Sequence, residues 1–131
     1  MKLQLKEWKA KDISFKVKEN GEGYEEEKNS FDLSMGHFFP KDQPKEFGIG
    51  LRVNINDNEF DLIVEMVFSF KLDREVDDEF KESDFIKINA PAIAFPYLRS
   101  FISNLTLQSG FPPIILPSVN FVQLAKEKTS K

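Results

Sequence analysis

Residue types that support catalysis or tight metal binding are scarce in this chain. Its 131 residues include no cysteine and one histidine, His37, which excludes a thiolate zinc site, a cysteine nucleophile and a histidine-rich metal site within one chain. A serine nucleophile needs a base beside it, and the only imidazole lies in segment 35–40, which has no G-x-S-x-G context. We therefore expect His37 to be an ordinary strand-end or loop residue, and we predict a protein that is not an enzyme.

Two further patterns match known binding motifs only in part. Gly48 and Gly50 form a G-x-G, but they lie within an alternating strand pattern and lack the third glycine and the helix of a dinucleotide-binding loop. Glycine inside a strand more often marks the close approach of another backbone. The acidic segment 73–84 lacks the spacing of a calcium-binding loop, and we expect a solvated loop there. We therefore predict no metal and no cofactor.

The charge balance argues against nucleic acid as a partner. Lysine and arginine number 18 against 22 aspartate and glutamate residues, a formal net charge of −4, whereas phosphate binding relies on a basic surface.

The length suits one domain, which we expect to span 1–131. The N-terminus has no apolar run typical of a signal peptide, and prolines interrupt the uncharged stretch 100–125, which disfavours a membrane span. We therefore expect a cytoplasmic protein without membrane insertion.

Alternation of apolar and polar residues predicts β-strands in the first two-thirds of the chain. The alternating segments are 13–17, 31–35, 47–55 and 60–72. Residues 56–59 carry side chains typical of turns, so the last two segments should form a long hairpin. Leu3 and Leu5 indicate a further short strand, and the polar segment 20–29 indicates a solvated loop.

Helical periodicity begins after Pro96. Apolar residues recur at positions 97, 98, 101, 102 and 105, which predicts an amphipathic helix with Pro96 in its first turn and Gly110 as its stop. Asn120 is placed to cap a short last helix through Lys128, and prolines exclude a central strand at 111–117. We therefore predict an α+β fold: an antiparallel sheet of four or slightly more strands, one main amphipathic helix and a short C-terminal helix.

The predicted sheet carries more apolar surface than the two predicted helices can cover. Fourteen phenylalanines are present, and segment 88–125 carries a single charged residue. Ile63 and Val67 make both faces of the strand 60–72 partly apolar, and an uncovered apolar sheet is normally resolved by association. The strand 31–35 is either part of the core or one wall of an apolar groove that accepts unstructured peptide.

Four segments resemble motifs of one known family. They are Lys-Asp-Ile-Ser-Phe at 11–15, Phe-Pro-Tyr-Leu-Arg at 95–99, Gly-Phe-Pro at 110–112 and Val-Asn-Phe at 119–121. In this order and spacing they are typical of the SecB protein-export chaperones, which the chain resembles from Leu5 to Leu124. The resemblance implies an ATP-independent chaperone that keeps unfolded preproteins competent for export by SecA and the Sec translocon. It also implies a homotetramer built as a dimer of dimers.

The resemblance further implies roles for particular residues. The peptide-binding groove would contain Phe31, Leu33, Met35, Phe121 and Leu124. The surface that contacts SecA would contain Asp12, Ile63 and Glu65, and the alternation independently places both acids on the polar side of the sheet. The assembly strand would contribute Val64, Met66 and Phe68, positions that serve equally well as intramolecular core.

Departures from the family pattern leave the client class open. Lys16 replaces an acid, Pro117-Ser118 replaces Ala-Pro, and the ten residues after Phe121 predict a short last helix without the family's acidic tail. Two chaperone functions therefore remain alternatives: general preprotein export, or a SecB-like specialist of a toxin–antitoxin pair. A small-ligand-binding β-domain that uses the same aromatic residues is an alternative of a different class, and a closed cavity in a monomer would favour it.

Overall fold

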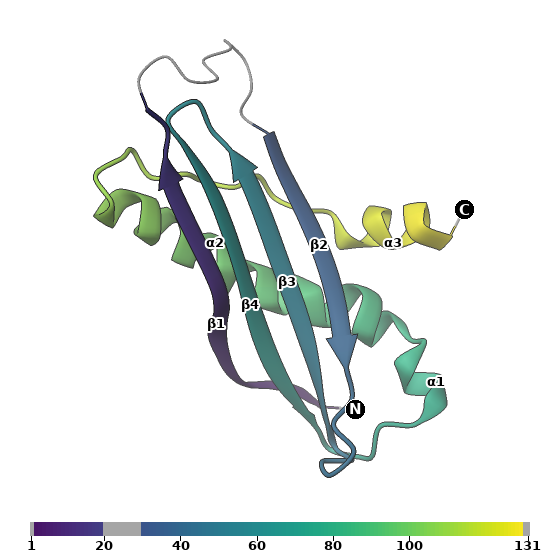
Figure 1. The fold of residues 1–131 in the computed structure, drawn as a ribbon. Coiled ribbons are helices and arrows are strands. Elements are labelled where there is room, and N and C mark those ends of the chain that lie inside the picture. The colour runs from purple at the N-terminus through teal and green to yellow at the C-terminus, as the bar shows by residue number, and fades with distance from the viewer. Residues whose placement is uncertain (1, 20–29, 130–131) are drawn as a thin grey trace.

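A computed structural model describes residues 2–19 and 30–129, and within them four antiparallel strands form one sheet (Figure 1). The strands are β1 (Leu3–Val17), β2 (Ser30–Phe38), β3 (Glu46–Asn56) and β4 (Phe60–Leu72). Their order across the sheet is β1-β4-β3-β2, so β1 and β2 are the edge strands. The predicted loop 20–29 lies outside the described residues.

Helices follow the strands, as the sequence predicted. The short α1 (Asp78–Lys81) and the π-helical turn η1 (Phe85–Asn89) lead into the long α2 (Ala90–Gln108), and α3 (Phe121–Thr129) follows. α2 crosses one face of the sheet, and α3 lies near the β2 edge (Figure 1). No helix of the described residues covers the opposite face, which is called the open face below. This arrangement confirms the predicted α+β fold.

The long hairpin predicted around residues 56–59 is present. β3 and β4 pair along almost their full lengths. At the turn, the Asp57 N–H donates to the Phe60 carbonyl at 3.0 Å, and the Asp57 carboxylate accepts from the Glu59 N–H at 2.9 Å. The aspartate side chain therefore closes the turn locally, which is the physical basis of its value as a turn signal.

β1 is one strand of 15 residues, where the sequence predicted two shorter strands. Its pairing with β4 shifts register after Leu5 and again after Ala10. Each shift inserts one extra residue, a β-bulge, and moves the following residues to the opposite phase of the alternation. Trp8 and Ile13 therefore face the same side as Leu5 despite their odd spacing. This hidden change of phase is the reason that alternation alone broke the strand in two.

The main helix begins earlier than predicted. α2 starts at Ala90 with Pro91 in its first turn, and Pro96 lies inside the helix. Proline in a helix interior leaves the carbonyl of the residue four positions earlier without a partner, here Ala92. Both Pro96 and Ala92 are exposed, so water can hydrogen-bond to that carbonyl and the helix continues. Pro96 is therefore an interior proline, and placing it in the first turn was wrong.

The acidic segment 73–84, predicted as a loop, contains the short helix α1. The Asp77 carboxylate accepts a hydrogen bond from the Phe80 N–H at 2.8 Å, which is the geometry of a helix N-cap. The Phe80 side chain is buried in the core. One buried aromatic residue and one capping aspartate are therefore enough to order a turn of helix within an otherwise solvated segment.

The end of α2 and the segment after it agree with the sequence. Gly110 has a φ of +96°, the left-handed conformation in which glycine commonly ends a helix. Residues 111–117, called the crossover loop below, form no strand. Two α2 side chains hold this loop: Ser103 Oγ donates to the Ile114 carbonyl at 2.6 Å, and the Ile114 N–H donates to Thr106 Oγ1 at 2.9 Å. The crossover loop therefore has a defined position despite its prolines.

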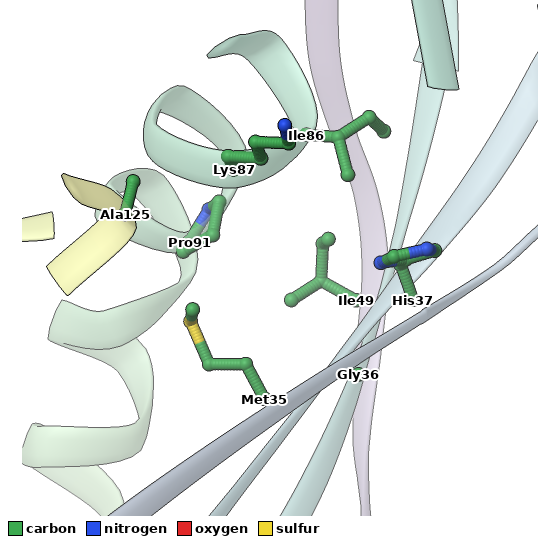
Figure 2. Close-up of a pocket in the computed structure, with 8 residues that line it drawn as sticks. All are labelled: Met35, Gly36, His37, Ile49, Ile86, Lys87, Pro91 and Ala125. Atoms are coloured by element: carbon green, nitrogen blue, oxygen red, sulfur yellow. The ribbon is translucent and has the colours of Figure 1, made fainter. Parts of the chain in front are cut away.

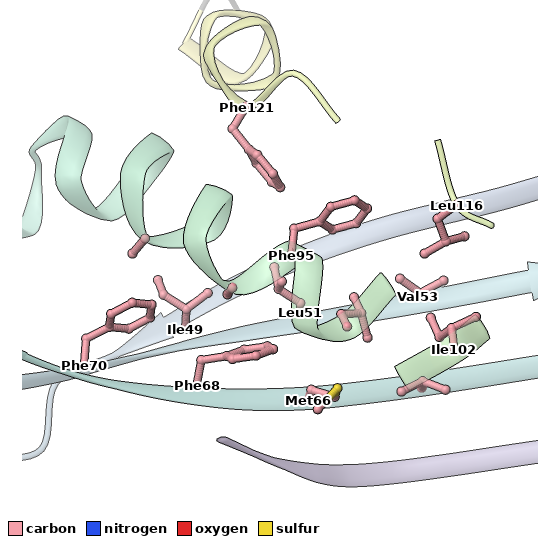
Figure 3. Close-up of a cluster of buried hydrophobic side chains, with 14 of the residues drawn as sticks. Ile49, Leu51, Val53, Met66, Phe68, Phe70, Phe95, Ile102, Leu116 and Phe121 are labelled. Atoms are coloured by element: carbon pink, nitrogen blue, oxygen red, sulfur yellow. The ribbon is translucent and has the colours of Figure 1, made fainter. Parts of the chain in front are cut away.

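The core forms between α2 and the facing side of β3 and β4. Figure 3 shows Phe95 and Ile102 of α2 above the apolar row of these strands. Val64, Met66 and Phe68, expected on the assembly strand, belong to this core, with exposed fractions of 0%, 3% and 0%. Side chains buried within a single chain have no surface left to bury against a second copy. The structure therefore corrects the predicted interface in favour of the intramolecular alternative.

Candidate functional site

β2 presents a row of apolar side chains on the α2 side of the sheet. Phe31, Leu33 and Met35 alternate along the strand, and each is half-buried against the core. They pair with the fully buried row of β3. Because β2 is an edge strand, β3 covers its row from one side only. These predicted groove residues therefore lie together on one surface, which we call the β2 groove.

The first hollow of the β2 groove lies where β2 approaches η1 and α2 (Figure 2). Its volume is about 210 Å³. The lining residues are Met35, Gly36, His37, Ile49, Ile86, Lys87, Pro91 and Ala125. This volume is below the 300–1,000 Å³ typical of small-molecule sites, and it suits one large side chain better than a free ligand.

A second hollow, of about 370 Å³, lies at the other end of β2 beside the crossover loop. It is lined by Ser30, Phe31, Ile55, Asp57, Ile114, Ile115, Leu116 and Pro117. Ile115 is 70% exposed, although the hydrogen bonds to Ser103 and Thr106 fix the loop that carries it. An exposed apolar side chain on a fixed loop beside an open hollow is a suitable contact for an apolar partner.

α3 completes the groove in a way that the sequence only partly indicated. The Phe121 ring packs against Phe95 at 5.8 Å between ring centres and is buried, so it anchors the helix. Leu124 is half-buried against the core, and Ala125 lines the first hollow. The predicted cap is present, since Asn120 Oδ1 accepts from a backbone N–H of α3 at 3.0 Å. Ala125 follows Phe121 by four residues, so helical spacing could have identified it.

Several lining residues were missed because the start of α2 was predicted too late. Ile86, Lys87 and Pro91 precede Pro96 and were not assigned to any helix. The missed signal was Pro91, since proline is favoured in the first turn of a helix. The crossover loop was correctly predicted to lack a strand, but its position beside β2 depends on long-range packing that periodicity does not report.

The two hollows suit an extended apolar segment. Phe31 and Met35 belong to different hollows and are four strand residues apart, about 13 Å at roughly 3.3 Å per residue. An extended segment lying along β2 can therefore place one side chain in each of the two hollows. The lining is mainly apolar, with a few polar groups at the margins. Such a surface binds by burying apolar area and requires no chemical step.

The open face carries an ion-pair cluster around Arg52 of β3. Arg52 Nη1 lies 2.9 Å from Glu65 Oε1 and 3.2 Å from Asp12 Oδ2, and Lys11 Nζ lies 3.4 Å from Glu65 Oε2. The strands pair so that Asp12, Glu65 and Arg52 stand in one row. The two predicted acids therefore do lie together, but a guanidinium that the sequence did not single out holds them both.

The rest of the open face mixes apolar and charged residues. Ile63 is half-buried on this face, and Lys16 stands opposite Asp61. The Phe38 ring lies directly over Gly48, where it occupies the space of a side chain. The glycine was predicted to permit the approach of another backbone, and the structure corrects this to an aromatic ring from the neighbouring strand. Gly48 is therefore required for packing, and no phosphate-binding loop is present there.

The outer edge of β1 and the adjoining part of α2 expose large apolar side chains. We call this surface the β1–α2 patch; it contains Trp8, Ile13, Val17, Ile93 and Tyr97, which are 39–60% exposed. The Trp8 and Tyr97 rings lie 4.4 Å apart between centres. β1 is also an edge strand, and an unpaired strand edge beside apolar side chains favours pairing with another chain. This patch was missed because the bulges in β1 disguise its phase.

Within the described ranges, the structure contains neither a cluster of metal-binding side chains nor a helix that could span a membrane. His37 is exposed at the margin of the first hollow, and no group of three or more His, Asp or Glu side chains in residues 2–19 and 30–127 could hold a metal ion. Of the helices that the structure describes, none has the length and apolar character needed to cross a membrane.

The pKa of Glu65 provides a test of the ion-pair cluster. The hydrogen bond from Arg52 lowers it most, partial burial opposes this, and Lys11 lowers it further. In Arg52→Gln the pKa of Glu65 should rise toward the ordinary glutamate value, as measured by carboxyl-resolved NMR titration, whereas Lys71→Gln should leave it unchanged. Because the pKa of Glu65 is lower in the folded state than in the unfolded chain, its ionisation stabilises the fold at pH values above the ordinary glutamate pKa. This stabilisation should be lost as pH falls through the lowered pKa, and an unchanged titration in Arg52→Gln would contradict the cluster.

Comparison with known proteins agrees with this geometry. The family model described as "Preprotein translocase subunit SecB" matches residues 1–131. A protein-export protein SecB from Dinoroseobacter shibae is 29% identical over 94 residues, which cover 66% of this chain and 54% of that relative. The match thus spans about half of the relative's length. An uncharacterized protein of Methanocaldococcus jannaschii is 27% identical over 124 residues, which cover 90% of this chain and 79% of that protein.

A solved structure shares the fold at low sequence identity. It is a SecB-like chaperone of Mycobacterium tuberculosis in complex with a peptide from the HigA1 antitoxin, with a TM-score of 0.66 and 14% identity over 90% of this chain and 88% of that one. Its likeness supports the architecture of one four-stranded sheet with a main helix and a short C-terminal helix. With a family model that matches every residue, the conclusion is that this chain belongs to the SecB family.

Proposed function

We propose that this protein is an ATP-independent holding chaperone of the cytoplasm, which binds extended, non-native segments of preproteins and keeps them competent for export. The observation that carries the proposal is the β2 groove, an apolar surface with two hollows on one side of an edge strand. The groove residues are Phe31, Leu33 and Met35, with Leu124 of α3 beside them and Phe121 as the anchor of that helix. The function is binding and release, with no catalytic residue.

The energetics favour weak and unselective contacts. Burial of one large apolar side chain stabilises a complex by about 1.5–3 kcal/mol, and ordering an unfolded segment offsets part of this gain. Two hollows in one chain therefore give modest affinity, and several copies that engage one client raise it through multivalency. Modest affinity per site suits a chaperone, because the client has to be released.

The class of client is the finer part of the proposal. The solved relative from M. tuberculosis holds a peptide of an antitoxin, whereas several curated relatives are named protein-export proteins. Both are polypeptide segments, in agreement with a groove for extended chain. We favour preproteins, and capture of this protein with its bound clients from its own cells would distinguish them. Recovery of a single antitoxin would replace general export by the specialist function.

Substitution in the groove tests the holding function. Phe31→Gln and Met35→Gln each place a polar side chain in one hollow, so each should weaken binding of an unfolded client about tenfold. Both should reduce the suppression of light scattering when a denatured substrate is diluted. Leu107→Gln is the matched control, because Leu107 is 53% exposed at the end of α2 and outside the groove. Equal losses in all three variants would argue against the β2 groove.

We further propose that the β1–α2 patch replaces the predicted residues of the assembly interface in a homotetramer built as a dimer of dimers. Its exposed side chains and the free edge of β1 are the features that a second copy would cover. Light scattering should give a mass near that of four 15.2 kDa chains, about 61 kDa. Ile13→Lys should lower this mass, because it places a charge in the patch, and a monomeric unsubstituted protein would contradict the proposal.

Contact with SecA is proposed for the open face, at Asp12, Ile63 and Glu65. The support is the family resemblance and the position of all three side chains on one face. Arg52 and Lys11 already balance the two acids, so apolar contact at Ile63 should contribute more than net charge. Ile63→Asp should therefore abolish binding to SecA in calorimetry while client binding persists. Failure of the unsubstituted protein to bind SecA would remove this contact from the function.

A further inference from the structure

We propose that the first hollow prefers a large apolar side chain with a carboxylate close beside it, so that favoured client segments carry aspartate or glutamate two positions from the apolar anchor. The inference rests on the proposed function, since it specifies the chemistry of the segment held in the β2 groove. It depends on two residues to which neither the motifs nor the fold assign a role, Lys87 and His37.

Lys87 is a cation at an otherwise apolar wall. It is half-buried on η1 and lines the first hollow with Ile86 and Pro91. Within residues 2–19 and 30–127, no carboxylate pairs with its ammonium group. By contrast, Lys81 lies near Asp78 at 3.9 Å and over the Phe39 ring at 5.0 Å. A cation that has no partner among these residues and lies beside an apolar wall can form a charge-assisted contact with an anion supplied by the client, and such a contact is stabilising.

His37 adds a second donor from the other wall. It projects from β2 at the margin of the hollow, whereas Lys87 comes from the helical side (Figure 2). Its ring packs near Phe39, at 5.3 Å between ring centres. A neutral imidazole donates one hydrogen bond, and an ammonium group donates three. Donors from two walls therefore face a client without an acidic side chain among the lining residues to compete.

The local backbone supports a binding role for this wall. η1 is a π-helical turn, a rare conformation that often occurs at functional sites. Ile86 is buried and anchors the turn, and the next residue, Lys87, lies at the hollow. The N–H groups of both residues donate to the Ser83 carbonyl, at 3.2 and 3.3 Å. The core thus fixes the backbone at Lys87, while its flexible side chain remains able to reach a carboxylate.

The size of the hollow and the geometry of an extended chain define the segment. A volume of about 210 Å³ accepts one large side chain. In an extended segment, side chains two residues apart lie on the same face and are separated by roughly 6.6–7 Å. A carboxylate two positions from the anchor therefore reaches the margin of the hollow where Lys87 lies. An amide at that position would accept a hydrogen bond but would not balance the charge.

Two labelled peptides test this preference by fluorescence anisotropy at low ionic strength. Both are unstructured and carry one phenylalanine, followed two positions later by glutamate in one peptide and by glutamine in the other. The glutamate peptide should bind about three- to tenfold more tightly, and salt should reduce the difference. Lys87→Met should abolish the difference, and Lys87→Arg should keep it. Lys9→Met, an equal change of charge on the open face, should also keep it.

The outcomes separate this inference from the function on which it rests. Equal affinity of the two peptides for the unsubstituted protein, or a preference that survives in Lys87→Met, overturns the carboxylate preference and leaves the groove intact. Failure of both peptides to bind overturns the groove itself, and the inference with it. Because Lys87→Arg keeps the cation, retention of the preference there shows that a loss in Lys87→Met is an effect of charge and does not result from misfolding.

Discussion

The packing of α2 onto the facing side of β3 and β4 is the interaction on which the rest of the structure depends. All seven α2-facing residues of β4, from Phe60 to Leu72, are at most 3% exposed. Complete burial of each large apolar side chain stabilises the fold by about 1.5–3 kcal/mol. The α2-facing side chains of the β3–β4 hairpin are therefore completely covered within the chain. They are no longer available for partners, and for this reason the predicted assembly residues proved to be core.

A single long helix cannot cover a sheet of four strands equally, and the surfaces proposed to bind partners lie where its cover ends. On one side the β2 row is half-buried and borders the two hollows. On the other side the β1–α2 patch remains exposed. The open face is partly apolar but is crossed by the Arg52 ion pairs. The proposed client groove, the proposed assembly interface and the proposed docking face thus lie on three separate surfaces of one small domain.

The walls of the β2 groove are held in fixed positions by contacts within the chain. Hydrogen bonds from Ser103 and Thr106 hold the crossover loop on one side, and the buried Phe121 and Ile86 anchor α3 and η1 on the other. The walls are therefore set by α2, whereas the β2 side belongs to an edge strand with fewer neighbours. A groove with anchored walls and an open edge can accept different extended segments without rearrangement of the core.

The sequence alone was sufficient for the fold class, the β3–β4 hairpin, the helix stop at Gly110 and the cap of α3, because each depends on local chemistry or on an unbroken period. The position of Phe31, Leu33 and Met35 on one face followed from the same alternation. Where the period was interrupted, prediction failed: the bulges in β1 hid the β1–α2 patch, and the interior Pro96 hid the start of α2.

Only the tertiary structure decided which apolar rows are buried and which remain open. Val64 and Phe31 look alike in sequence, since both belong to alternating strands, but one strand is central and the other is at the edge. The fold also decides which charges are paired. Arg52 forms an ion pair with Asp12, 40 residues away in the sequence, whereas Lys87 forms an ion pair with none of the described acids. Strand order and helix placement are long-range properties. A local pattern shows that a side chain has a face, and the fold determines what that face meets.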